Sequence, residues 1–224
     1  ARMPGLKLDG DNPKHARSQG YFSLIRNFRH HSWLLLLLFG ASPLVQRGFA
    51  EGMPHILKAF GRDALGLPHA TTLRMGPLGY QSEAQASIGA SYNCLKSYAE
   101  SLYDALTSPW PAYEKIGIRH DGQYRQLSTS LLQIENEFYG TIRPKQPIRK
   151  GERPLAALAA RGVEYIEVRL MDLDPFSAIG ITAETIRFLD IFLLHCLLSD
   201  SPRDTPEINA AQSANRHTVA QRGR

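Results

Sequence analysis

The sequence predicts an α+β fold in which an antiparallel sheet is flanked by long helices. Segments with helical spacing of apolar residues are long, strand-like segments are short, and the two kinds do not alternate regularly along the chain. The 224 residues are 43% hydrophobic and 21% charged, a composition that fits a globular protein with a sizeable core.

The first predicted element is a helix over residues 14–39. The stretch Asp11-Asn12-Pro13 offers a capping side chain and a first-turn proline, and Gly40 followed by Ser42-Pro43 predicts the end of the helix. The apolar run at its end covers seven residues, 33–39, whereas a membrane span needs about 20. We therefore interpret the run as the end of a core helix and expect no membrane partner.

The middle of the chain predicts smaller elements. Residues 44–68 carry no clear signal, and 70–80 predict a short strand followed by a Gly-Pro loop. A second long helix is expected over 83–106, where apolar residues recur at steps of three or four. Asp121-Gly122 is typical of a hairpin turn between two strands.

The last part of the chain predicts two strands and a third helix. The strands cover 130–139 and 163–170, and the helix covers 183–198 with Thr182 as its cap. The polar segment 201–224 leaves two alternatives, a helix without a packing partner or a disordered tail.

Both of these predicted strands carry charged residues among apolar ones. Alternation along 163–170 places Glu167 and Arg169 on one face, roughly 6.5 to 7 Å apart, where a carboxylate could hold Mg²⁺ and a guanidinium the phosphate oxygens bridged to it. Glu135 and Glu137 likewise share a face and would repel unless water, arginine or a cation lay nearby. The alternative is a solvated face with weak ion pairs, and the pattern alone favours it.

Several classes of protein are excluded or disfavoured. The chain has no phosphate-binding loop, no dinucleotide-binding glycine motif, and no zinc-protease or serine-hydrolase signature. Its two cysteines, Cys94 and Cys196, are far apart, which argues against a zinc site and a disulfide scaffold and fits a reducing cytoplasm. The net charge of +5 is not gathered into basic runs, so we expect no nucleic-acid partner.

A series of stretches, taken in order and spacing, resembles the proteobacterial glutamate–cysteine ligase (γ-glutamylcysteine synthetase) family. The resemblance extends from about Ser18 to Leu198. It rests on the segments QGYF with IRN (19–27), LFGASP (38–43), ATTLRM with LGY (70–80), LQIENE with Tyr139 and IRPK (132–145), GVEYIEVR (162–169) and DPF (174–176).

The resemblance implies a fold, a reaction and cofactors. The fold would be similar to the glutamine synthetase catalytic domain, whose antiparallel sheet holds metals and nucleotide on its concave face. The reaction would join the γ-carboxylate of L-glutamate to the amine of L-cysteine through a γ-glutamyl phosphate, as the first step of glutathione biosynthesis. ATP and Mg²⁺ would be required, the substrates would be small molecules, and the enzyme would be cytoplasmic.

The same resemblance implies roles for individual residues. Glu167 would be a Mg²⁺ ligand, and Arg169 the catalytic group that contacts the transferred phosphoryl or the γ-carboxylate. The cysteine pocket would include Arg74, Tyr80 and Tyr139. Four further residues match the family motif as candidates for contacts to ATP, phosphate or metal, namely Glu135, Glu137, Arg143 and Lys145.

Members of this family are more than twice as long as the chain. Residues 1–224 therefore resemble the central part of one catalytic domain, and we expect no ligase activity from them alone, because Glu167 by itself cannot hold a magnesium cluster. Three alternatives stay open: another carboxylate–amine ligase of the same superfamily, a non-catalytic basic binding module, and a product without function. The sequence leaves the oligomeric state open.

Overall fold

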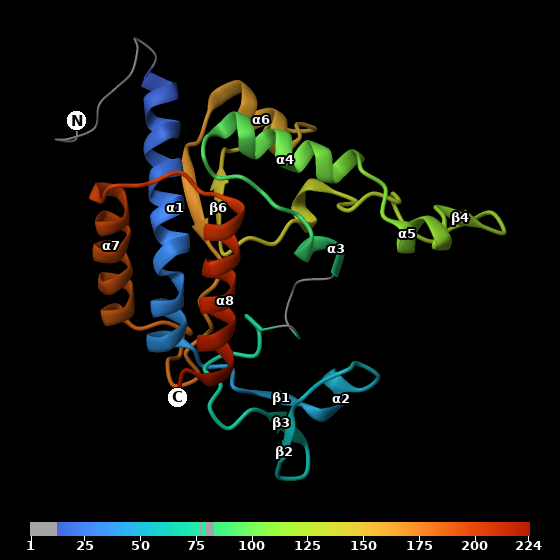
Figure 1. Ribbon diagram of the computed structural model, residues 1–224, viewed down its shortest axis with the longest axis vertical. Helices are drawn as coiled ribbons and strands as arrows, with labels where there is room; N and C mark the ends of the chain where they lie inside the picture. Colours follow the sequence, from blue (N-terminus) through green and yellow to red (C-terminus); the bar gives the residue numbers. More distant parts are fainter. Residues whose placement is uncertain (1–12, 77, 79–82) are drawn as a thin grey trace. The chain divides into compact units, whose positions relative to one another are not determined.

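The computed structural model describes residues 13–76, 78 and 83–224, and they form two compact units (Figure 1). Unit 1 contains the chain through Arg26, then Gln81–Glu167 and Asp200–Asp204. Unit 2 contains Asn27–Tyr80, Val168–Ser199 and Thr205–Arg224. The first helix, α1 (Pro13–Phe39), contributes residues to both units, and the predicted helix over 14–39 is confirmed.

Unit 2 is built on helices that pack side by side. Helix α7 (Ala183–Leu198) has the predicted bounds, and the Thr182 side chain caps it by accepting a hydrogen bond from the Thr185 backbone N–H. Phe28 of α1 meets Phe192 of α7 edge to face, with ring centroids 5.7 Å apart. The polar segment after Ser201 forms helix α8 (Pro206–Arg222), as one alternative expected. The helix is nevertheless packed, because Ala220 is fully buried and its carbonyl accepts the Thr71 N–H at 2.9 Å.

A small three-stranded sheet completes unit 2. It contains β1 (Leu44–Gln46), β2 (Lys58–Phe60) and β3 (Ala64–Gly66) in the order β1-β3-β2, all antiparallel, with α2 (Arg47–Ala50) beside them. The strand predicted within 70–80 is wrong for the described residues of that stretch, where only Thr72 makes an isolated bridge, to Ser42.

Unit 1 contains short helices and two pairs of strands. The helices are α3 (Glu83–Ala86), α4 (Leu95–Thr107), α5 (Pro111–Ile116), α6 (Pro154–Arg161) and the 3₁₀ turn η1 (Glu135–Glu137). The strands are β4 (Arg119–His120) with β5 (Gln123–Tyr124), and β6 (Ile142–Lys145) with β7 (Tyr165–Val168). The predicted hairpin is confirmed, with Asp121 at φ 50° and Gly122 at φ 76° between its strands.

The single helix predicted over 83–106 is wrong, because the chain leaves the helical path between α3 and α4. The Asp204 carboxylate accepts the backbone N–H of Tyr92 at 2.9 Å and holds this connection in a non-helical course. Helix α4 then begins afresh, since the Cys94 thiol accepts a hydrogen bond from the Ser97 N–H at its N-cap.

The strand predicted over 130–139 is also wrong, because its carboxylates bind backbone groups. Glu137 accepts the N–H of Gln133 at 2.7 Å, which closes the η1 turn, and Glu135 accepts the N–H of Leu155 at the start of α6, also at 2.7 Å. The strand predicted over 163–170 is confirmed in its middle and is shorter than expected, ending at Val168.

The α+β class is confirmed, whereas the described strands form three small sheets. The core of unit 1 includes Phe22, Tyr98, Leu132 and Ile142, with the Phe22 and Tyr98 rings 5.8 Å apart. None of the helices in the described part of the chain is both long and apolar enough to cross a membrane.

Candidate functional site

The carboxylate that the sequence singled out first, Glu167, lies on β7 beside a cation on β6. Its Oε2 is 3.3 Å from Nζ of Lys145, and both side chains are partly exposed, at 42% and 26%. The strands are adjacent because the Glu164 N–H donates to the Lys145 carbonyl at 2.9 Å. Oε2 is shielded from solvent and forms no hydrogen bond with the described residues, so only the loose ion pair balances its charge.

Arg143 lies on the same strand as Lys145 and is buried, with 6% of its surface exposed. Its Nη2 donates a long hydrogen bond of 3.4 Å to the Glu135 carbonyl, and its Nε makes none within the described part of the chain. Burial, with a smaller contribution from Tyr92, raises the pKa of Tyr98, and the Arg143 guanidinium opposes this rise only in part. A buried guanidinium with an unsatisfied donor is suited to an anion or to packing.

The two acidic residues of η1 are occupied within unit 1. Both Glu135 and Glu137 use a carboxylate oxygen to accept a backbone N–H, so the alternation that put them on one strand face does not apply. Tyr139 is half-buried, and its backbone N–H donates to the Gln85 side chain at 3.1 Å. Their proposed contacts with substrate, ATP or metal stay predictions.

In unit 2, Arg74 is tied to the segment that follows β7. Its Nε donates to Asp172 Oδ1 at 2.7 Å, and its Nη atoms donate to three carbonyls, of Arg169 (3.1 Å), Leu170 (2.6 Å) and Met171 (2.7 Å). The Asp172 side chain is 1% exposed and also accepts the backbone N–H of Ala41 at 3.0 Å. Asp172 was missed by the sequence reasoning, since nothing local links it to a partner 98 residues away.

The remaining predicted residues are Tyr80 and Arg169. Tyr80 lies outside the described residues. Arg169 follows the last residue of β7, so the strand alternation that placed it beside Glu167 does not reach it, and its role stays a prediction. Among the described residues, no group of three or more His, Cys, Asp or Glu side chains is arranged to hold a metal ion.

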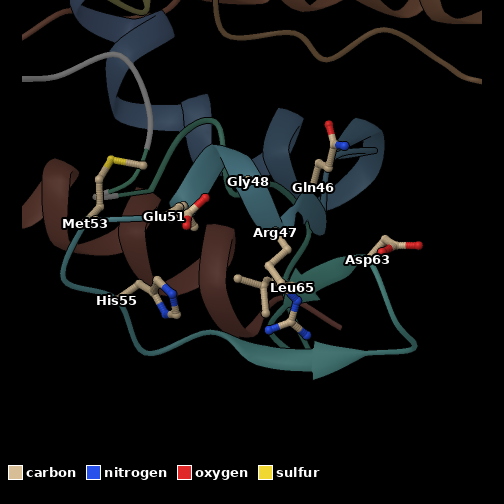
Figure 2. A pocket seen from close by; sticks show the side chains of 10 residues that line it. Gln46, Arg47, Gly48, Glu51, Met53, His55, Asp63 and Leu65 are labelled. Carbon is tan, nitrogen blue, oxygen red and sulfur yellow. The ribbon is translucent and has the colours of Figure 1, made fainter.

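Unit 2 also contains two hollows. One has a volume of about 530 Å³ and is lined in part by Asp172, Asp174 and Phe176. The other, about 460 Å³, lies beside α2, and Figure 2 shows the side chains of Arg47 and Glu51 around it. None of the predicted site residues in the described part of the chain lines either hollow.

A family model described as glutamate-cysteine ligase matches residues 6–219. The chain belongs to this family. It is 56% identical over 208 residues to the glutamate–cysteine ligase of Hahella chejuensis, which covers 93% of this chain and 40% of that relative. It is 55% identical over 186 residues to that of Pseudomonas paraeruginosa, which covers 83% of this chain and 35% of the relative. The resemblance read from the sequence is thus confirmed.

Solved structures agree with the family assignment. The glutamate–cysteine ligase of Francisella tularensis, in complex with AMP, is similar with a TM-score of 0.87 and 39% identity, over 92% of this chain and 41% of that one. A bifunctional glutathione synthetase from Pasteurella multocida has a TM-score of 0.67 at 24% identity, over 97% of this chain and 23% of that one, and shows the fold alone. The chain spans about 40% of the length of the ligases it matches.

Proposed function

We propose that the chain forms the central part of the catalytic domain of an ATP-dependent glutamate–cysteine ligase, with a glutamine synthetase-like sheet to which β6 and β7 belong. The reaction joins the γ-carboxylate of L-glutamate to the amine of L-cysteine through a γ-glutamyl phosphate, in the cytoplasm and as the first step of glutathione biosynthesis. The observation that carries the proposal is the Lys145–Glu167 pair on adjacent strands of a chain in this family. The AMP complex of the Francisella relative supports a nucleotide site.

Glu167 fits one position in the coordination of Mg²⁺. Its Oε2 is shielded, makes no hydrogen bond and is balanced only by an ammonium group, and carboxylate oxygens are the ligands that Mg²⁺ prefers. Glu167 would supply one of the oxygen ligands that Mg²⁺ requires, and the other ligands would have to come from elsewhere. When bound, Mg²⁺ neutralises charge on the phosphates.

The basic candidate residues act on phosphate oxygens. Lys145 leaves its ion pair to hold a phosphate, and the unsatisfied Nε of the buried Arg143 donates a hydrogen bond toward the same group. Arg169 contacts the transferred phosphoryl or the γ-carboxylate and stabilises the negative charge that develops on it. Glu137 closes the η1 turn, and Glu135 ties this turn to the start of α6.

Tyr80 and Tyr139 contact the cysteine substrate, and Arg74, whose guanidinium is bound by Asp172 and three backbone carbonyls, serves the substrate site by fixing residues 169–171. Tyrosine hydroxyls donate hydrogen bonds to the polar ends of the amino acid, and apolar neighbours enclose its thiol. With the amine held against the acyl phosphate, it attacks the carbonyl carbon, the amide bond forms, and inorganic phosphate leaves. The proton that the amine nitrogen loses goes to the departing phosphate, so that atoms and charge balance.

The test is a chimera in which this chain replaces the matched stretch of the Hahella chejuensis relative. Formation of γ-glutamylcysteine and of ADP is measured with cysteine and with a panel of other amines. We expect turnover by the chimera and none by the 224-residue chain. A folded chimera without turnover would contradict the proposal, and a preferred amine other than cysteine would assign the chain to another carboxylate–amine ligase.

A further inference from the structure

Helices α1 and α7 pack together in unit 2 through a contact that contains three histidines (Figure 1). His30 and His31 are consecutive on α1, and their rings meet edge to face with centroids 4.7 Å apart. The centroid of the His31 ring also lies 5.7 Å from that of His195, in the last turn of α7. Each imidazole can become a cation near pH 6.5, so three groups of the same potential charge lie at one helix contact.

The histidine cluster adjoins the hydrogen bonds that hold the end of α7 on α1. Asn27, one turn before His31, is 6% exposed, and its Nδ2 donates to the carbonyls of Cys196 at 2.8 Å and of Ser199 at 3.1 Å. Cys196, the residue after His195, is fully buried, and burial raises the pKa of its thiol to about 12. A charge on the cluster therefore arises directly beside the contacts that keep α7 in place.

Burial and two neighbouring imidazoles lower the pKa of His31. Burial of this half-buried side chain has the largest effect, followed by the charges of His30 on α1 and of His195 on α7. Within the described part of the chain no carboxylate opposes these effects, including Asp190 and Asp200, the acidic residues nearest to His195 in the sequence. The cluster thus has no acidic partner that would favour its protonated form.

Acid weakens the contact between the two helices. The unfolded chain binds a proton at His31 with the ordinary pKa of about 6.5, whereas the folded chain resists that proton. Because the unfolded or locally opened state then binds more protons, the stability that the contact provides is fully present at neutral pH and is lost as the pH falls below about 6.5.

We propose that His30, His31 and His195 form an acid-sensitive contact between α1 and α7, closed when the imidazoles are neutral and opened when they are protonated. Opening moves the end of α7 away from α1 and exposes the thiol of Cys196 to water. The opening is local, so the remaining helices of the chain keep their structure. The inference does not depend on ligase activity.

The first measurement is the rate at which the two thiols of the 224-residue chain react with 4,4′-dithiodipyridine, resolved by mass spectrometry. Cys94 of unit 1 is partly exposed and serves as the internal control, because the thiolate fraction of both residues falls with pH. We expect the rate of Cys196 relative to Cys94 to rise between pH 7.5 and 5.5 by at least threefold and up to about tenfold, since one proton changes such an equilibrium by at most tenfold per pH unit. Far-UV circular dichroism should stay constant over this range.

The second measurement uses substitutions of single histidines. His217 on α8 is the matched control, because it is also half-buried and burial, with the charge of Arg216, lowers its pKa too. H31Q should abolish the rise in relative labelling of Cys196, and H217Q should leave it unchanged. In NMR titrations of the imidazole nitrogens, H195Q should raise the pKa of His31, since it removes a neighbouring positive charge, and leave that of His217 unchanged.

A relative labelling rate that does not change with pH would refute the acid-sensitive contact, and this result needs no variant. A rise that coincides with loss of the far-UV signal would refute it as well, because the chain would then be unfolding as a whole. The same conclusion follows if H217Q suppresses the rise as strongly as H31Q, or if H195Q leaves the pKa of His31 unchanged. Since no arm measures turnover, failure of the ligase proposal would leave these results unaffected.

Discussion

Two ion pairs of the chain, Lys145–Glu167 and Arg74–Asp172, join oppositely charged groups in very different surroundings. The first joins two partly exposed side chains through a single contact of 3.3 Å, and Glu167 Oε2 makes no hydrogen bond. The second has a carboxylate that is 1% exposed, a contact of 2.7 Å, and hydrogen bonds from Arg74 to three consecutive carbonyls. An ion pair gains little in water, and it becomes a fixed part of the fold when it is desolvated and fully hydrogen-bonded.

The difference indicates that one pair stabilises the fold and that the other is available to bind ligands. Arg74 and Asp172 fix the backbone of residues 169–171 and are satisfied by the protein itself. Lys145 and Glu167 hold each other weakly and can exchange that contact for a phosphate oxygen and a metal ion. Substitutions in the two pairs should therefore affect different measured quantities.

Asp172→Ala should produce the largest effect, a loss of about 3 kcal/mol or more in the free energy of unfolding. It leaves the Arg74 guanidinium and the Ala41 N–H without their shared acceptor, and breaking a buried pair from one side typically costs 3 to 5 kcal/mol. Urea denaturation of the 224-residue chain measures it. A loss below about 1 kcal/mol would show that the pair is not part of the architecture.

Glu167→Gln should instead reduce turnover of the chimera about 100-fold, equivalent to ~2.7 kcal/mol in the activation free energy. The neutral amide keeps the shape of the side chain and removes the anionic ligand. The free energy of unfolding should change by less than ~1 kcal/mol, because the pair is partly exposed. Equal losses of stability and turnover would mean that Glu167 serves the fold rather than the reaction.

Lys145→Gln should have a smaller effect, confined to nucleotide affinity. We expect the KM for ATP in the chimera to rise about tenfold with little change in kcat, since the ammonium contacts a phosphate that is bound before the reaction as well as during it. Steady-state kinetics over a range of ATP concentrations separates the two constants. A fall in kcat at constant KM would instead mean that Lys145 interacts with the substrate only in the transition state.

Local signals decided which parts of the fold the sequence could predict. Helix α7 begins at the Thr182 cap, and helix α1 ends at Gly40, whose N–H donates to the Leu36 carbonyl one turn earlier. The helix over 83–106 was mispredicted because the distant Asp204 carboxylate binds the backbone N–H of Tyr92. The strand over 130–139 was mispredicted because its own Glu135 carboxylate binds the distant backbone N–H of Leu155. Apolar periodicity contains no information on such contacts.

The same distinction applies to the candidate site. Alternation along 163–170 correctly placed Glu167 on a strand, whereas its partner Lys145 entered only through the family resemblance, as a separate candidate. Asp172 was not predicted at all, because its importance comes from Arg74, which lies far away in the sequence. A pattern of residues can indicate a charged strand, but pairing between strands and loops requires the three-dimensional structure.

A third pair, Arg161–Glu152, extends the comparison to the smallest expected effect. Both Arg161 Nη atoms donate to the Glu152 carboxylate, at 2.6 and 2.8 Å, and these hydrogen bonds, with one from the Arg149 N–H, lower the pKa of Glu152 from 4.5 to about 2. A depressed pKa in the folded state contributes stability that is fully present above pH 4.5 and is lost as the pH falls toward 2.

Glu152→Gln should therefore reduce the slope of melting temperature against pH between about 4.5 and 2. Near pH 7 the slope should be the same in the variant and in the original chain. Thermal unfolding of the chain and the variant across this range measures the effect. An unchanged acid slope would show that this pair contributes nothing measurable, although the Glu152 side chain is less exposed than that of Glu167, at 20% against 42%.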